Sequence, residues 1–400
     1  MENLENQNIQ ENENLENKST QNNISNIEKQ KLKEYRETIR FLQKSLERNY
    51  NNIDIYYIRA KSKYTLRLYK EAIEDFNKVI ELDKKHYSSH YYKALSYMSM
   101  SDYNKALEGF NKLIEIGHKT AEIYHYKAVA NSILGKFEEA IKDYDNVIEL
   151  DRSYYGVYMD RAIAKMKLKL YDDAVLDFDE AIKINSKDLL ALSNRALIKM
   201  YQQKYQEAIK DLDVAINLDN VDYYLYYNRG VAKVNIELNQ EAILDLNAAI
   251  EILQSNIDLD NPHLFYIYYN RGKVYKKLDN YDNAMKDFEN ALKINKKDDD
   301  IYNDIAMLQF IQKKYDEALD NVEKALDINV SNYLSYLNRF KIRYEMNKDL
   351  MDEEMMMQEL YPDLENSYKY SNESIKQDIL ELAKKNKIAS KFVADKNISK

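Results

Sequence analysis

The segment Tyr69-Lys-Glu-Ala-Ile-Glu-Asp-Phe76 returns 34 residues later as Tyr103-Asn-Lys-Ala-Leu-Glu-Gly-Phe110. The same pattern continues through eight units of the chain, at 53–86, 87–120, 121–154, 155–188, 189–222, 223–256, 265–298 and 299–332. A period in this range is typical of a solenoid, in which each repeat buries its apolar face against its neighbours. Positions within a unit are numbered below as columns, with Ile53 in column 1 of the first unit.

Two columns of the unit hold only small residues. Column 20 is alanine in every unit: Ala72, Ala106, Ala140, Ala174, Ala208, Ala242, Ala284 and Ala318. Column 8 holds Ala60, Ala94, Ala128, Ala162, Ala196, Gly230, Gly272 and Ala306. A small residue at one fixed point in each half marks where two antiparallel helices approach most closely, because a larger side chain would push them apart. The pattern therefore predicts one helical hairpin per unit.

Aromatic residues in columns 4 and 17, together with small column 8 and Ala in column 20, form a pattern that resembles the tetratricopeptide repeat family. The resemblance implies an all-α fold, a right-handed α-solenoid of about eight regular hairpins with degenerate end units. The family usually carries Pro in column 32, where this chain has residues such as Lys84 and Asn220. We therefore expect polar residues to make the turns between hairpins, namely Asp83, Asp151, Asn185, Asp219 and Asn295.

Composition supports a helical chain and limits its partners. The 400 residues include only 2 Pro and 6 Gly, and no Cys, so disulfides and thiolate metal sites are excluded. A formal net charge of −9 opposes broad affinity for nucleic acid or anionic lipid. The sequence shows neither a signal peptide nor an apolar run long enough for a membrane span. We expect a soluble, cytoplasmic protein with no nucleic-acid or membrane partner.

The frame divides the chain into segments. We expect a disordered Asn/Glu-rich tail at 1–26, a degenerate N-terminal repeat at 27–52, repeats at 53–256 and 265–332 around an enlarged loop at 257–264, a degenerate ninth repeat at 333–370, and a C-terminal capping helix with its tail at 371–400. In the ninth repeat Phe340 occupies column 8 and Asp352 column 20, so this hairpin should not close like the others. The capping helix is expected to start at Ser374, which forms a capping box with Gln377.

No catalytic or cofactor motif is present. The glycines never cluster into a phosphate-binding loop, and the chain contains no His-Glu-x-x-His motif. His86 and His90 are the closest approach to a metal site, but two histidines supply too few ligands. We expect no enzyme activity, no cofactor and no metal.

Two charged columns predict an ion pair inside each hairpin. Column 7 is mostly basic (Arg59, Lys93, Lys127, Arg161, Arg195, Arg229, Arg271) and column 23 mostly acidic (Asp75, Asp143, Asp177, Asp211, Asp245, Asp287). The eighth unit has lost both partners together, to Ile305 and Asn321. A structural role is favoured, because a partly buried Arg prefers a bidentate carboxylate.

Column 6 is the main candidate for a binding surface. From the fourth unit on it reads Asp160, Asn194, Asn228, Asn270, Asp304 and Asn338, here called the Asx column. It lies roughly 160° around the helix from columns 4 and 8, so it should face the open groove. The run resembles the asparagine ladder of the O-linked N-acetylglucosamine transferase array, which implies binding of an extended peptide backbone by amide side chains. The alternative is that these residues are solvated or bonded between helices.

The first three units place tyrosines on the same face: Tyr57, Tyr91, Tyr92 and Tyr126. Tyrosine is favoured at binding surfaces, although the chain is rich in tyrosine throughout. The carboxylate clamp found in relatives that bind heat-shock proteins needs a basic column 5, which is absent. The sequence thus favours a non-enzymatic scaffold that binds a peptide segment of a partner protein.

Two alternatives remain open. The first is self-association into a homo-oligomer through exposed ends, such as the cluster Met351, Met355, Met356 and Met357. The second is a substrate-recognition arm of an enzyme acting in trans.

Overall fold

The computed structural model describes residues 29–154, 156–255, 261–351 and 353–385. These residues form helices joined by short loops, and no strand occurs among them. The first helix covers residues 29–48. It is followed by α2 (Ile53–Thr65), α3 (Tyr69–Leu82), α4 (Tyr87–Ser99), α5 (Tyr103–Glu115), α6 (Ala121–Ile133), α7 (Phe137–Leu150), α8 (Val157–Lys167), α9 (Tyr171–Ile184), α10 (Leu189–Tyr201), α11 (Tyr205–Leu218), α12 (Tyr223–Asn235), α13 (Asn239–Ser255), α14 (His263–Lys277), α15 (Tyr281–Ile294), α16 (Asp299–Ile311), α17 (Tyr315–Ile328), α18 (Tyr333–Asn347), α19 (Glu353–Tyr370) and α20 (Glu373–Lys385).

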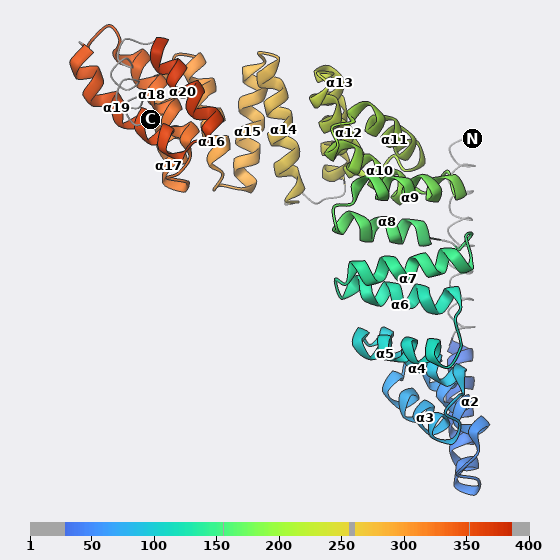
Figure 1. Ribbon diagram of the computed structural model, residues 1–400. Coiled ribbons are helices and arrows are strands. Elements are labelled where there is room, and N and C mark those ends of the chain that lie inside the picture. Colours follow the sequence, from blue (N-terminus) through green and yellow to red (C-terminus); the bar gives the residue numbers. More distant parts are fainter. Residues whose placement is uncertain (1–28, 155, 256–260, 352, 386–400) are drawn as a thin grey trace, which may run out of the picture. The chain divides into compact units, whose positions relative to one another are not determined.

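The chain divides into two compact units, one ending at Ala191 and the other starting at Leu192. Within each unit, consecutive helices pair into hairpins, and each hairpin packs on the next one (Figure 1). The pairs are α2–α3, α4–α5, α6–α7 and α8–α9 in the first unit, and α12–α13, α14–α15, α16–α17 and α18–α19 in the second. The hairpin repeat and the all-α solenoid fold are confirmed.

Columns 8 and 20 lie where the two helices of a hairpin touch. All eight column-20 alanines are fully buried. At Gly272, an added Cβ would lie 2.7 Å from Cε1 of Phe288, and at Gly230 it would lie 3.1 Å from Cγ of Leu246. The close approach predicted from the small residues is therefore confirmed, and the aromatic ring of Phe288 fills the space that Gly272 leaves.

Each regular hairpin turns through a residue in the left-handed conformation at column 15. After α2, Arg67 has φ 61°, its N–H donates to the carbonyl of Tyr64, and the next N–H, of Leu68, donates to the carbonyl of Lys63. These two bonds form a Schellman motif, which satisfies the last carbonyls of the helix. The other positions are Ser101, Gly135, Lys169, Gln203, Glu237, Asp279 and Lys313. Only one of them is glycine.

The turns between hairpins use the polar residues expected there. Oδ1 of Asp83 accepts a hydrogen bond from the N–H of Lys85 at 2.9 Å, and Oδ1 of Asn295 accepts one from Lys297 at 3.1 Å. Asp151, Asn185 and Asp219 make the same bond to the residue two positions further on. These Asx turns replace the proline of the family pattern and fix the junctions locally.

The insertion expected at 257–264 lies between α13 and the first residues of α14. Helix α13 extends to Ser255, and α14 starts at His263 behind Pro262. Residues 256–260 lie outside the described residues, as does the tail at 1–26. The boundary between the two compact units falls within α10.

The ninth hairpin has a different register from the one expected. Arg339 pairs with Asp363 across 24 residues, whereas the equivalent pair Arg271–Asp287 spans 16. Counting back from Asp363, column 20 falls on Leu360, whereas Asp352, the residue expected there, lies outside the described residues. Leu360 and Phe340 are both buried, so no close contact between small residues forms here.

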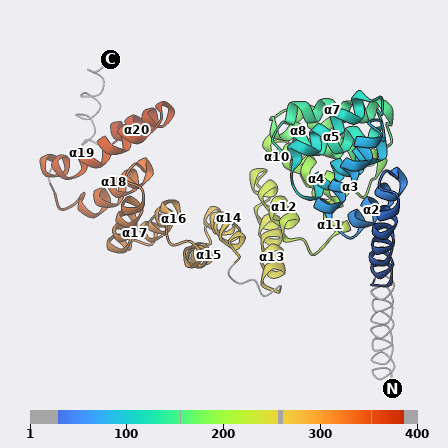
Figure 2. The same ribbon diagram turned by 90° about the horizontal axis from the view of Figure 1, so that it is seen from below.

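Helix α20 completes the core of the ninth hairpin. Ile379 is buried against Phe340, Leu360 and Leu364, and α20 contacts α19, beside which it lies in Figure 2. The predicted capping helix is confirmed, but its start is not. Oδ1 of Asn372, rather than the side chain of Ser374, accepts a hydrogen bond, from the N–H of Ile375 at 3.0 Å.

Candidate peptide-binding face

The predicted ion pairs form inside the hairpins and are structural. In α12–α13, Nη2 of Arg229 lies 2.6 Å from Oδ1 of Asp245, and Nζ of Lys233, one turn further, lies 2.9 Å from Oδ2. Arg229 also reaches Asp213 of the preceding repeat at 2.8 Å. Equivalent column 7–23 pairs are Arg59–Asp75, Lys127–Asp143, Arg161–Asp177, Arg195–Asp211 and Arg271–Asp287. These pairs hold the two helices of a hairpin together, and they also connect neighbouring hairpins.

The Asx column bonds to column 5 of the preceding repeat. Oδ2 of Asp160 lies 2.9 Å from Nε2 of His125, and Nδ2 of Asn338 donates to Oδ1 of Asn303 at 3.3 Å. Nδ2 of Asn270 donates to the hydroxyl of Tyr227 at 3.1 Å. Three members of the Asx column, Asp160, Asn270 and Asn338, therefore make contacts between repeats.

Burial differs along the Asx column. Asn228 and Asn338 are only 4% and 2% exposed, which corrects the expectation that these two side chains face an open groove. Asn338 is hydrogen-bonded to Asn303 of the preceding repeat. Asp160, Asn194, Asn270 and Asp304 are half-buried and retain some access to solvent. Nδ2 of Asn228 is buried without a hydrogen-bond partner.

Asp304 forms an ion pair with a lysine of the preceding repeat. Nζ of Lys276 lies 2.6 Å from Oδ1 of Asp304. Burial, followed by the negative charge of Asp304, raises the pKa of Tyr269 in the preceding repeat. This tyrosine hydroxyl therefore stays protonated and can donate a hydrogen bond.

The structure brings the N-terminal tyrosines together. The rings of Tyr91 and Tyr92 lie 5.4 Å apart, and those of Tyr91 and Tyr126 lie 6.3 Å apart. Tyr92 stacks on Phe76 at 6.1 Å, and Tyr57 lies 6.3 Å from the same Phe76 ring. All four tyrosines are half-buried, so one side of each ring packs on the core while the rest remains accessible.

Tyr91 also makes a polar contact across repeats. Its hydroxyl donates to Oε1 of Glu122 at 2.6 Å. Burial and this bond to a carboxylate raise the pKa of Tyr91. The hydroxyl thus acts as a donor already committed within the chain, and a ligand would have to displace Glu122 to use it.

A second tyrosine cleft lies between the starts of α12 and α14, and the sequence analysis did not single it out. It encloses about 270 Å³ and is lined by Tyr223, Tyr224, Tyr227, His263, Tyr266 and Ile267. Tyr224 is 38% and Tyr266 54% exposed. Burial, followed by the neighbouring Tyr224, raises the pKa of Tyr227. The dense tyrosine runs at 223–227 and 266–269 were the available signal.

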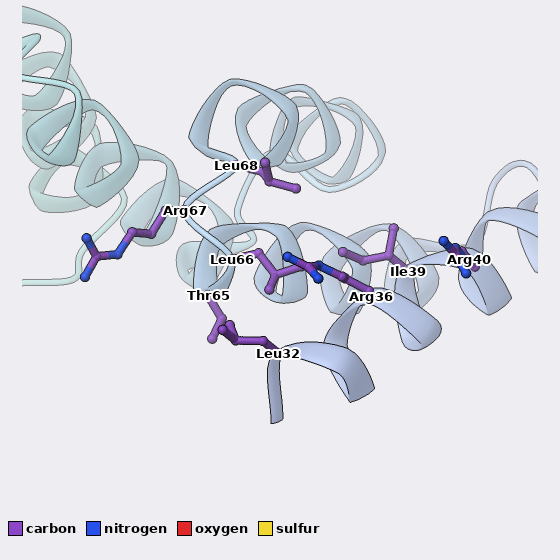
Figure 3. A pocket seen from close by; sticks show the side chains of 8 residues that line it. All are labelled: Leu32, Arg36, Ile39, Arg40, Thr65, Leu66, Arg67 and Leu68. Atoms are coloured by element: carbon purple, nitrogen blue, oxygen red, sulfur yellow. The ribbon is translucent and has the colours of Figure 1, made fainter. Parts of the chain in front are cut away.

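A cleft of about 440 Å³ lies at the N-terminal end of the first unit (Figure 3). Arg36 and Arg40 reach it from the first helix, and Arg67 lies on the turn after α2. Leu32, Ile39, Thr65, Leu66 and Leu68 complete the lining. None of these described lining residues is a carboxylate, so this cleft is apolar with a cationic rim.

The two histidines and the methionine cluster that the sequence singled out lie as follows. Nδ1 of His86 accepts from the N–H of Ser89 at the start of α4, and Nε2 of His90 lies 3.0 Å from the carbonyl of Lys84. Met351 packs on the core of the ninth hairpin, whereas Met355 is exposed. The side chains of Met356 and Met357 lie outside the description.

The described part of the chain lacks both a metal-binding cluster and a membrane-spanning helix. No group of three or more His, Asp or Glu side chains there is arranged to hold a metal ion. No helix there has the length and apolarity that crossing a membrane requires.

Comparison with known proteins agrees with the repeat frame. Family models described as tetratricopeptide repeat match residues 53–86, 121–154, 265–298 and 299–331. Among curated proteins no sequence matches the chain.

Solved structures show similar folds. The C-terminal part of a TPR repeat-containing protein from Cytophaga hutchinsonii matches with a TM-score of 0.55 and 16% identity, over 61% of this chain and 97% of that one. YrrB, described as a TPR protein with an unusual peptide-binding site, matches with a TM-score of 0.42 and 18% identity, over 46% of this chain and 94% of that one. The repeat frame, the paired helices and the family matches together show that the chain is a tetratricopeptide repeat protein.

Proposed function

We propose that this chain is a non-catalytic scaffold that binds an extended peptide segment of a partner protein along the face formed by columns 5 and 6. Tetratricopeptide repeats support a protein-interaction scaffold in general. The proposal of a peptide-binding face rests on one observation: the Asx column contacts the second tyrosine cleft. There, the side chain of Asn270 touches the hydroxyl of Tyr227, which lines the cleft.

The chemistry of this cleft suits a peptide. Tyr224 and Tyr266 offer rigid apolar area with a polar tip, which is favoured in binding hot spots. Nδ2 of Asn270 is occupied by Tyr227 and by the carbonyl of Tyr266. No hydrogen bond from the described residues reaches its Oδ1, which can accept one from a peptide N–H. An amide contact of this kind binds the backbone of a peptide whatever its side chains are, while the tyrosines favour peptides with apolar side chains.

The first experiment selects ligands from a displayed library of random peptides and measures their affinity for purified variants. The double variant Tyr224→Ala/Tyr266→Ala should weaken binding about a hundredfold or more, because two hot-spot aromatics are removed. Tyr201→Ala is the matched control, since Tyr201 is 70% exposed and lies outside the cleft. Equal affinity of the double variant and the wild type would refute the assignment of the cleft.

A second experiment tests the Asx column position by position. Asn270→Ala should weaken peptide binding about threefold to tenfold, the value of one neutral hydrogen bond. Asn228→Ala should leave affinity unchanged, because that side chain is buried and cannot touch a ligand. If the selected peptides bind both variants as they bind the wild type, the Asx column serves only the contacts between repeats. The tyrosines Tyr57, Tyr91, Tyr92 and Tyr126 then become the next candidates.

A further inference from the structure

The hairpin α4–α5 departs from the ion-pair rule of the array. In the hairpins described above, a cation in column 7 meets an aspartate in column 23, and in α16–α17 both partners are replaced together. In α4–α5 the cation is kept as Lys93, but column 23 is Gly109. This hairpin therefore retains the positive partner and lacks the negative one.

Lys93 has no substitute partner. Its side chain is half-buried, and the structure gives it no hydrogen bond or ion pair with any described residue. Burial lowers the pKa of Lys93, and the charge of Glu108 opposes this effect only in part. By contrast, Nζ of Lys127 in the next hairpin lies 2.7 Å from Asp143.

A cavity of about 190 Å³ opens beside Lys93. Its lining includes His90, Lys105 and Lys112, and Glu108 contributes the only carboxylate of the lining. Three lysines against one glutamate make the cavity cationic. Tyr97 takes the column-11 place that a lysine holds in several other hairpins, and it forms another wall.

The two outer lysines already have exposed partners. Nζ of Lys105 lies 2.8 Å from Asp102, and Nζ of Lys112 lies 2.8 Å from Glu115, each one helical turn away. Such exposed pairs contribute little and rearrange easily. Of the three lysines that line this cavity, Lys93 is thus the one without an ion-pair partner among the described residues.

The chain cannot supply the missing carboxylate from column 23 without rearrangement. A Cβ added to Gly109 would lie 2.8 Å from Cβ of Ala94, closer than real Cβ contacts. The helices α4 and α5 approach so closely at this point that a side chain there would force them apart. Among the described residues, Glu108 is the one carboxylate that lines the cavity, and it forms no ion pair with Lys93. The place next to Lys93 is therefore open to a carboxylate or phosphate of a ligand.

We propose that this cavity binds an oxyanion, a carboxylate or phosphate, whose oxygens take the place next to Nζ of Lys93 that the aspartate carboxylate occupies in the other hairpins. The internal repeats supply the geometry, because six hairpins place a carboxylate at this position. The oxyanion is either a free small anion or an acidic side chain of a bound protein. The site shares no lining residue with the tyrosine cleft, so it adds a second binding function to the proposed one.

The test measures anion binding to the full chain by calorimetry and by the midpoint of thermal unfolding, at constant ionic strength set with chloride. The probes are inorganic phosphate and a blocked hexapeptide of glutamate. Both the wild type and Lys78→Met should bind at least one probe, since Lys78 is an exposed lysine outside the cavity. Lys93→Met should bind about tenfold more weakly or worse, because a charge-assisted contact is lost.

The outcome also identifies the source of the anion. Binding of phosphate alone indicates a free anion, and tighter binding of the peptide indicates an acidic protein segment. If neither probe binds the wild type, or if Lys93→Met binds as well as Lys78→Met, the proposal is wrong.

A second pair of variants tests the same site through Gly109. Gly109→Ala introduces only the close contact with Ala94, whereas Gly109→Asp also introduces the carboxylate. The aspartate variant should be more stable than the alanine variant and should no longer bind the probe that binds the wild type, because Lys93 then has an internal partner. Binding of that probe to Gly109→Asp at wild-type affinity would overturn the proposal.

Discussion

Removing one partner of an ion pair inside a hairpin should lower the free energy of unfolding strongly, whereas replacing both partners should lower it only slightly. We consider Asp245→Asn in α12–α13, against a triple variant that also carries Arg229→Ile and Lys233→Gln. The triple variant transfers the side chains of the eighth repeat, Ile305, Gln309 and Asn321, to the sixth. In α16–α17 these side chains replace the ion pair with a hydrogen bond from Nδ2 of Asn321 to Oε1 of Gln309 at 2.8 Å.

The contacts of Asp245 set the size of the effect. The carboxylate is 4% exposed, and it accepts from Arg229 at 2.6 and 3.0 Å and pairs with Lys233 at 2.9 Å. Removing one partner of a buried pair costs about 3–5 kcal/mol, because the other charge stays buried. Arg229 keeps its contact with Asp213 at 2.8 Å, so the expected cost of Asp245→Asn is lower, about 2–3 kcal/mol. The triple variant leaves no buried charge, and its cost should stay below about 1 kcal/mol.

Urea denaturation followed by circular dichroism measures these differences, since urea does not screen charges as guanidinium chloride does. Repeat arrays need not unfold in a two-state manner, so amide hydrogen exchange of α12 and α13 should accompany it. The predicted difference between the variants is refuted if the triple variant loses as much stability as Asp245→Asn. It also fails if Asp245→Asn alone leaves the exchange rates of both helices unchanged.

Three further predictions concern single residues. Gly272→Ala should lower the urea midpoint by an amount equivalent to about 1–3 kcal/mol, because its Cβ would lie 2.7 Å from the ring of Phe288. An unchanged midpoint would mean that the Phe288 ring can move away without loss of stability. Lys169→Gly should stabilise the α8–α9 hairpin by up to about 1 kcal/mol, measured in the same assay, because Lys169 has φ 61°; a destabilised variant would show that this conformation carries no strain. Burial holds the pKa of His90 in the folded chain below 6.5. The stability that His90 contributes is therefore fully present above pH 6.5 and is lost as the pH falls through this lower pKa. Between pH 7 and 5 the wild type should lose more stability than His90→Gln, and equal losses would contradict the lowered pKa of His90.

The sequence by itself determined the repeat and its internal contacts. Small residues at Gly272 and Ala284, and opposite charges at Arg271 and Asp287, recur at fixed spacing because each hairpin must close in the same way. These contacts span about half a repeat, so the periodicity of the chain encodes them directly. The hairpins, the ion pairs and the Asx turns could all be predicted for this reason.

Only the tertiary structure decided what happens between repeats and at the end of the array. The long connection before α19 moves column 20 to Leu360, which counting columns from the regular frame could not reveal. Asn228 and Asn270 occupy the same column, yet one is buried and the other half-buried, because burial depends on how closely the neighbouring helix packs. The tyrosine cleft and the isolated Lys93 arise for the same physical reason: a column pattern records which side chain is present, whereas the packing of adjacent helices decides which of its atoms remain open to a ligand.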